Sequence, residues 1–125
     1  MSAMAATYNM VLYQAATFVK QLRWLDSEGK PIDLRKPIDL TGYKALMQVR
    51  LSHNHDEVVI ELSTENGRIF LEETEGKIQL IVDAESTKKL LPALYVYDLL
   101  LISAGGIATR LIEGQLTVKA AVSRL

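Results

Sequence analysis

Apolar and polar residues alternate over most of this 125-residue sequence. A period of two residues is typical of a β-strand with one buried face, and helical periodicity is scarce. In residues 43–51 the alternation places five side chains on one face: Tyr43, Ala45, Met47, Val49 and Leu51. The same pattern predicts strands at residues 7–13, 16–25, 43–51, 57–62, 68–72, 77–83, 94–103 and 107–122.

Turn-forming residues separate the predicted strands. Asn66-Gly67 is typical of a β-hairpin turn between two of them. Residues 83–92 are the one helical candidate and Pro92 forces their end, so we expect one short connecting helix near 84–90. Crossover helices are missing, which argues against a parallel sheet. We therefore predict an all-β fold, an antiparallel immunoglobulin-like β-sandwich of about eight strands.

Length and composition favour one soluble globular domain spanning residues 1–125, with residues 1–6 flexible and no signal-peptide pattern. The net charge is −1, and no basic stripe indicates a nucleic-acid partner. The absence of cysteine excludes disulfides, thiolate metal sites and cysteine nucleophiles. The apolar stretch 90–108 contains Asp98 near its middle, where a carboxylate is costly in a bilayer, so we expect no membrane span.

The tetrapeptide Pro-Ile-Asp-Leu occurs twice within residues 29–42, at 31–34 and again at 37–40. Each proline lacks a backbone donor, so neither copy suits a central strand. Adding residues to a surface loop changes its closure entropy little. We therefore interpret the duplication as an insertion in the loop before the predicted strand 43–51. The alternative is that one copy pairs with a neighbouring subunit as an added edge strand.

Few residues form a pattern that points to chemistry. His53 and His55 lie two residues apart and could share one side of a strand, which makes them weak candidates for a metal site. A solvated turn is the favoured interpretation, because two ligands do not close a site. The carboxylates Glu72, Glu73 and Glu75 are interpreted as hydrated turn residues. We predict no catalytic residue, no cofactor and no enzymatic activity.

The predicted strand 94–103 is apolar on both faces. One face carries Tyr95, Tyr97, Leu99 and Leu101, and a two-layer core covers only one face of a strand. Its other face is therefore either covered by another part of the chain or meets another subunit, and we favour the subunit contact. Leu46 lies on a face that is otherwise polar, and Asp98 is expected to reach solvent, a subunit contact or Arg110, because a buried unpaired carboxylate is costly. The predicted interface consists of Leu46, Val96, Asp98, Leu100 and Ile102.

Four segments in this order cover nearly the whole chain: YNMVLYQAATF; DSEGKPIDLTGYKALMQVR with one repeat copy removed; STENGRIFLEETEGKIQLIVDAESTKKLLPALYVYDLLL; and RLIEGQLTVKAAVSR. Their order and spacing resemble a family of small structural proteins of tailed bacteriophages, similar in style to the N-terminal domain of baseplate upper proteins. The resemblance implies a β-sandwich of the tail, baseplate or neck of a virion, made in the cytoplasm of the bacterial host. It also implies homo-oligomeric assembly, other virion proteins as partners, and no catalytic residues.

The sequence departs from the family pattern at four places. The family has one Pro-Ile-Asp-Leu before Thr41-Gly42, and this chain has two. The family favours glycine near Ala15 and Leu94 and a charged residue near Leu46. Two origins of these departures stay open, natural variation and engineering that redirects self-association.

Two alternatives come from other functional classes. A carbohydrate-binding β-sandwich module would use exposed tyrosines such as Tyr8 and Tyr13. A metal-dependent enzyme would use His53 and His55 and is the more distant of the two.

Overall fold

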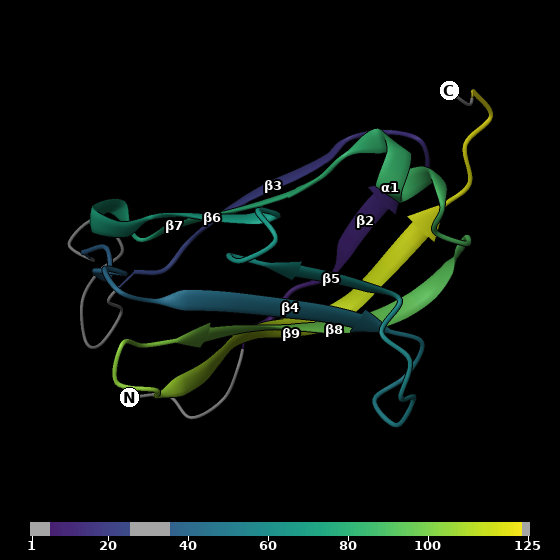
Figure 1. Cartoon of the computed structure of the whole chain (residues 1–125). Helices are drawn as coiled ribbons and strands as arrows, with labels where there is room; N and C mark the ends of the chain where they lie inside the picture. Colours follow the sequence, from purple (N-terminus) through teal and green to yellow (C-terminus); the bar gives the residue numbers. More distant parts are fainter. Residues whose placement is uncertain (1–5, 26–35, 124–125) are drawn as a thin grey trace.

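The alternating segments of the sequence form the strands of two β-sheets that face each other (Figure 1). The structure, a computed structural model, describes residues 6–25 and 36–123. Its strands are β1 Ala6–Thr7, β2 Met10–Tyr13, β3 Phe18–Arg23, β4 Lys44–Arg50, β5 Ile60–Ser63, β6 Ile69–Glu72, β7 Lys77–Val82, β8 Ala93–Ile102 and β9 Ala108–Lys119. A short helix, α1 Ala84–Lys88, and a 3₁₀ turn at Glu73–Glu75 join them.

The larger sheet has the strand order β1-β9-β8-β4-β5, with β2 also paired to β9, and the smaller sheet has the order β3-β7-β6. In an immunoglobulin-like sandwich, the second, fifth and fourth strands share one sheet and the third, sixth and seventh share the other. In this structure, the first of these groups consists of β3, β7 and β6. The second group consists of β4, β8 and β9. The predicted immunoglobulin-like β-sandwich with one short connecting helix is therefore confirmed, and most of its strand pairs are antiparallel.

The core lies between the two sheets and is filled by the alternate residues that the sequence pattern turns inward. Strands β4, β7 and β8 supply half of its buried hydrophobic residues, because the residues on one face of each are buried. The largest side chains with almost no exposure are Leu12, Leu40, Met47, Leu62, Ile78, Leu80, Leu99, Leu101 and Leu116. In the part of the chain that the structure describes, no helix combines the length and apolarity needed to cross a membrane.

Two pairings depart from the antiparallel expectation, because β1 and β2 both run parallel to β9. Strand β2 runs parallel to β9, with Met10 opposite Leu116 and Tyr13 opposite Lys119. Parallel neighbours need a long crossover only when they are close in sequence. Here the two strands come from opposite ends of the chain, so the whole sandwich separates them and no crossover helix is needed.

The Asn66-Gly67 turn is not a hairpin, and the prediction of one there is wrong. Strands β5 and β6 on either side of it belong to different sheets. The Asn66 side chain stabilises the turn itself, because its Oδ1 accepts hydrogen bonds from the backbone N–H groups of Ser63 and Arg68, both at 3.0 Å. These bonds let the chain pass from one layer to the other.

Ala15 has a φ of 63°, in the left-handed region that favours glycine. The residue lies in the turn between β2 and β3, where the chain crosses from the larger sheet to the smaller one. Glycine adopts this backbone conformation without strain, whereas a residue with a Cβ atom adopts it less readily.

The second copy of the repeated tetrapeptide is an integral part of the sandwich. Pro37 forms a bridge with Leu25, and the Ile38 N–H donates to the Trp24 carbonyl at 2.9 Å. Leu40 is completely buried. The first copy, with the rest of residues 26–35, lies outside the described residues, as does the predicted flexible segment 1–6 apart from Ala6.

Deletion of residues 31–36 is expected to change the free energy of unfolding by less than about 0.5 kcal/mol. The deletion leaves one Pro-Ile-Asp-Leu-Thr-Gly segment intact and only shortens a loop, and closure entropy depends weakly on loop length. Urea unfolding of both chains measures the difference. A loss of 2 kcal/mol or more, on the order of a core truncation, would show that the first copy makes its own contribution to the fold.

Candidate interaction surface

The five residues predicted as an interface lie on one face of the larger sheet, the face that points away from the core. Strand β4 pairs with β8 so that Leu46 is opposite Leu100, and Gln48 is opposite Asp98. The same register places Val96 and Ile102 on the same side of β8, one toward each end of the strand. We call this surface the outer face; it consists of Leu46, Val96, Asp98, Leu100 and Ile102 with the polar neighbours Gln48, Arg50, Arg110 and Glu113. The five predicted residues are half-buried.

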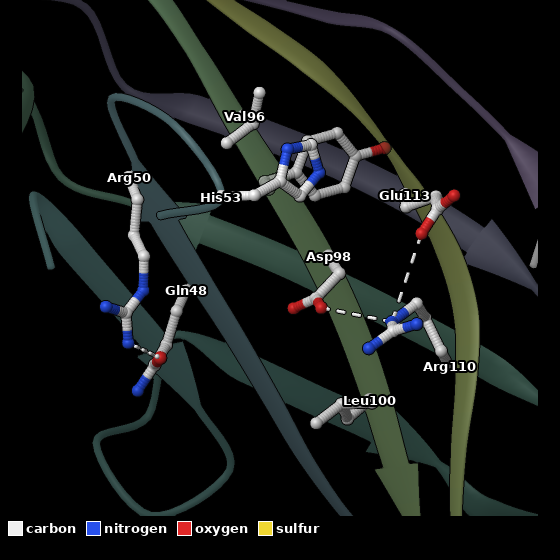
Figure 2. A pocket seen from close by; sticks show the side chains of 9 residues that line it. Gln48, Arg50, His53, Val96, Asp98, Leu100, Arg110 and Glu113 are labelled. Atoms are coloured by element: carbon white, nitrogen blue, oxygen red, sulfur yellow. Dashed lines mark hydrogen bonds and ion pairs between the residues drawn. The ribbon is translucent and has the colours of Figure 1, made fainter. Parts of the chain in front are cut away.

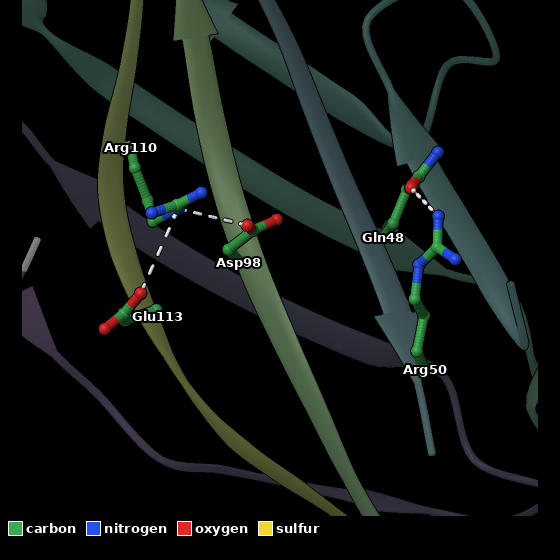
Figure 3. A network of polar contacts seen from close by, with 5 residues as sticks. All are labelled: Gln48, Arg50, Asp98, Arg110 and Glu113. Carbon is green, nitrogen blue, oxygen red and sulfur yellow. Dashed lines mark hydrogen bonds and ion pairs between the residues drawn. The ribbon is translucent and has the colours of Figure 1, made fainter. Parts of the chain in front are cut away.

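A polar network crosses this face from β8 to β9 (Figure 3). The Arg110 Nε donates to Asp98 Oδ2 at 3.1 Å and lies 3.9 Å from Glu113 Oε1. A β-bulge between Leu99 and Leu100 adds one residue on β9 and sets Arg110 beside the carboxylate of Asp98. The predicted contact with Arg110 is therefore present in the structure. Because these side chains remain partly exposed, each ion pair contributes at most about 1 kcal/mol.

Arg50 anchors the loop that follows β4. Its guanidinium donates to Gln48 Oε1 at 2.9 Å and to the carbonyls of His55 and Asp56 at 2.9 and 2.8 Å. All three acceptors are neutral groups, so these bonds position the loop without a carboxylate neutralising the charge of Arg50. The anchored loop brings His53 beside β8.

The outer face is hollowed between the Arg50 side and the Asp98 side (Figure 2). The depression has a volume of about 480 Å³ and is open to solvent. It is lined by Gln48, Arg50, His53, Val96, Tyr97, Asp98, Leu100, Arg110 and Glu113. Val96 and Leu100 thus flank Asp98 in a depression that also contains Arg50 and Arg110, and this mixture of aliphatic and charged groups is suited to contact with a protein surface.

The two histidines play different roles in the structure. His53 lines the depression, whereas the hydrogen bonds of His55 are made by its backbone: its carbonyl accepts from Arg50, and its N–H donates to the Ser52 carbonyl at 3.2 Å. Among residues 6–25 and 36–123, no group of three or more histidine, cysteine or acidic residues is placed to hold a metal ion. Glu75, from the acidic 3₁₀ turn, forms an exposed ion pair with Arg23 at 3.7 Å.

The two tyrosines proposed for carbohydrate binding have different surroundings. The Lys20 ammonium lies 5.0 Å from the centre of the Tyr8 ring and occupies one of its faces. Tyr13 is 58% exposed, on β2 at the margin of the larger sheet.

Sequence reasoning missed the polar contacts of two buried tyrosines in β8. The Tyr95 hydroxyl donates to the Leu91 carbonyl at 2.6 Å, which ties the corner after α1 to the start of β8. Tyr97 donates to the Tyr8 carbonyl and so joins the core of the larger sheet to the N-terminal strands. Two tyrosines on an otherwise aliphatic inward face are a usable signal, because a buried hydroxyl needs a partner.

Exposed apolar residues on the smaller sheet were also missed. Val19 on β3 and Phe70 on β6 are 54% and 58% exposed, on the side away from the core. They are more exposed than the predicted interface residues, which shield one another.

Comparison with models of protein families and with curated proteins finds no match for this sequence.

Proposed function

We propose that this chain is a non-enzymatic structural protein of a tailed-bacteriophage particle, in its tail, baseplate or neck, and that it acts by self-association. The observation that carries the proposal is the outer face, where the Leu46–Leu100 pair, Val96 and Ile102 lie half-buried. In the described part of the chain, no third layer covers this face (Figure 1). The resemblance to phage structural proteins supports the class of protein, and the virion would be its location.

The charges on the outer face favour a second copy of the same chain as the occupant. Arg50, on β4, directs its hydrogen bonds to neutral groups. Asp98 and Glu113, on β8 and β9, share the single guanidinium of Arg110. On β4 and β5, Arg50 and Lys44 face outward together with one carboxylate, Glu61, which accepts a hydrogen bond from Gln48 at 2.9 Å. This side of the face therefore has one excess positive charge, and the β8–β9 side has one excess negative charge. A surface that carries both signs in separate places can be self-complementary across a twofold axis.

Contact through this face is favoured over edge-to-edge addition of strands. The outward carbonyl of Glu61 on edge strand β5 already accepts hydrogen bonds from Asn66 Nδ2 at 2.9 Å and Arg68 at 3.0 Å. On β3, the edge strand of the smaller sheet, Lys20 is opposite the core residue Leu80 and points inward. Occupied edge groups and inward-pointing lysines are devices that hinder strand addition.

Substitution of Leu100 by lysine tests this proposal. Light scattering on a sizing column, across a range of concentrations, should give a defined multiple of 13.9 kDa for the unchanged chain. The substitution places a charge in the centre of the proposed contact and is expected to weaken self-association at least about 30-fold. Val19→Lys is the matched control, since it adds the same charge to the outside of the smaller sheet.

The two variants separate the possible outcomes. Dissociation by Leu100→Lys with retention of the oligomer by Val19→Lys supports the outer face. The reverse pattern would assign assembly to the smaller sheet. A monomer at every concentration of the unchanged chain would remove self-association from the proposal.

A further inference from the structure

Residues 37–40 occupy a defined site at one end of the sandwich, formed by Trp24, Leu25 and Glu73, which we call the seat. Pro37 bridges to Leu25, the Ile38 N–H donates to the Trp24 carbonyl at 2.9 Å, and the Leu40 N–H donates to the Glu73 carbonyl at 2.8 Å. Leu40 inserts its side chain into the core, where it is completely buried.

The seat is closely fitted to the backbone of this segment. A Cβ atom added to Gly76 would lie 2.7 Å from the Trp24 carbonyl oxygen and 3.0 Å from that of Ile38. Glycine is therefore needed at position 76 to let the segment approach. The seat contacts backbone groups and the side chains of one proline, one isoleucine and one leucine, all of which residues 31–34 also supply.

We propose that residues 31–34 can take the place of residues 37–40 in this seat, so that the folded chain has two registers offset by six residues. In the shifted register, Pro31 would pair with Leu25 and Leu34 would fill the core position of Leu40. The duplication would then be a spare copy of a segment that the fold requires.

The lengths of the connecting loops make little difference to the relative stability of the two registers. In the observed register, 11 residues (26–36) precede the seated segment and three (41–43) follow it before β4. In the shifted register, the numbers would be five (26–30) and nine (35–43). Closure entropy then favours the observed register by less than about twofold. A five-residue loop that contains Gly29 is also an ordinary length for a hairpin connection.

The turn after the seat decides which register dominates. Asp39 Oδ1 accepts hydrogen bonds from the Thr41 hydroxyl at 2.6 Å and from its N–H at 3.0 Å. Gly42 has a φ of 80°, which suits glycine. In the shifted register, Arg35 and Lys36 would occupy these two positions, without the hydroxyl and without glycine. The loss of this hydroxyl bond and the placement of a lysine at a φ of 80° both disfavour the shifted register, which would therefore be a minor state.

Substitution of Leu40 by alanine tests the spare copy. In a chain that lacks residues 31–36, the cavity is expected to reduce the folding equilibrium constant by at least about 30-fold, and up to several thousandfold. In the full chain, the loss is limited to the cost of changing register. Adding Leu34→Ala to the Leu40→Ala chain should then restore the larger loss, although Leu34→Ala alone has little effect. Urea unfolding measures all of these constants.

A control and a second variant make the test decisive. Leu99→Ala, at a buried position of β8 outside the repeat, should reduce the equilibrium constant equally in the full and the shortened chain. The double substitution Arg35→Thr and Lys36→Gly gives the first copy the same following turn as the second. In that chain, Leu40→Ala should reduce the folding equilibrium constant by only about twofold, the loss of one of two equal registers.

Equal losses for Leu40→Ala in the full and the shortened chain would overturn the proposal. So would a Leu34→Ala substitution that adds nothing to Leu40→Ala. A recovery that appears only at high protein concentration would mean that the first copy fills the seat of a neighbouring chain, and this too would overturn the register exchange within one chain.

Discussion

Replacement of Gly114 by alanine is expected to lower the free energy of unfolding by about 3 kcal/mol. Gly114 lies on β9 opposite Tyr97, beneath the N-terminal strands. A Cβ atom at this position would collide with the carbonyl group of Tyr8 and would lie 2.9 Å from Asn9 Oδ1. Relief of the collision requires β1 and β2 to move away from β9, which also breaks their backbone hydrogen bonds.

The collision involves backbone atoms, so a side-chain rotation cannot relieve it. The bonds at risk include Tyr8 N–H to the Glu113 carbonyl at 2.9 Å and Gln115 N–H to Asn9 Oδ1 at 3.0 Å. Urea unfolding measures the loss of stability, and hydrogen exchange of residues 6–13 shows whether the N-terminal strands have detached.

Gly105→Ala is the matched control. Its added Cβ atom would have Ser103 Oγ as its nearest neighbour at 3.9 Å, an ordinary contact. The control should therefore unfold at nearly the same urea concentration as the unchanged chain. Equal effects of the two substitutions would show that the approach of Tyr8 to Gly114 does not constrain the fold.

Alternation predicted which residues lie inward because side-chain direction in a strand depends only on local geometry. Strand β8 is an example, since Tyr95, Tyr97, Leu99 and Leu101 are all buried as the pattern requires. The helix near 84–90 was also predictable, because Pro92 sets its limit locally.

Strand partners were harder to predict because they depend on residues that are distant in sequence. Asn66-Gly67 is compatible with a hairpin, but the Asn66 side chain instead stabilises a crossing between sheets. The parallel pairing of β2 with β9 joins the two ends of the chain, and alternation carries no information about such a partner. The need for glycine at position 114 arises from that pairing and was hidden for the same reason.

The candidate surface was predictable in position but not in exposure. Leu46 and Leu100 lie on the expected face, and Asp98 contacts the expected Arg110. Exposure depends on which neighbours cover a side chain. Leu46 and Leu100 are opposite each other and shield one another, whereas Val19 lies on an edge strand and stays 54% exposed.

High pH is expected to destabilise the protein through the two buried tyrosines of β8. Burial raises the pKa of Tyr97, with a smaller contribution from Tyr8, and burial also raises the pKa of Tyr95. An unfolded tyrosine ionises near pH 10, whereas these phenols keep their protons in the fold. The folded state therefore binds more protons above pH 10, and stability falls as the pH rises.

The expected slope is about 1.4 kcal/mol per pH unit for each tyrosine, between its unfolded and folded pKa values. Below about pH 9 the two tyrosines contribute no pH dependence, because both states are protonated there. Above pH 10, stability should therefore fall with each further pH unit, because the unfolded Tyr97 loses its proton while the buried one keeps it. Urea unfolding at pH 8, 10, 11 and 12 measures this decline.

Tyr97→Phe separates the proton linkage from the hydrogen bond. The variant loses the bond to the Tyr8 carbonyl, which should lower stability by about 1 kcal/mol at pH 8. Above pH 10 it should decline less steeply than the unchanged chain, so that the two stability curves converge or cross. Tyr13→Phe, at a position that is 58% exposed, should keep the full slope. Parallel curves for Tyr97→Phe and the unchanged chain would mean that Tyr97 ionises equally readily in both states, and that its burial does not control alkaline unfolding.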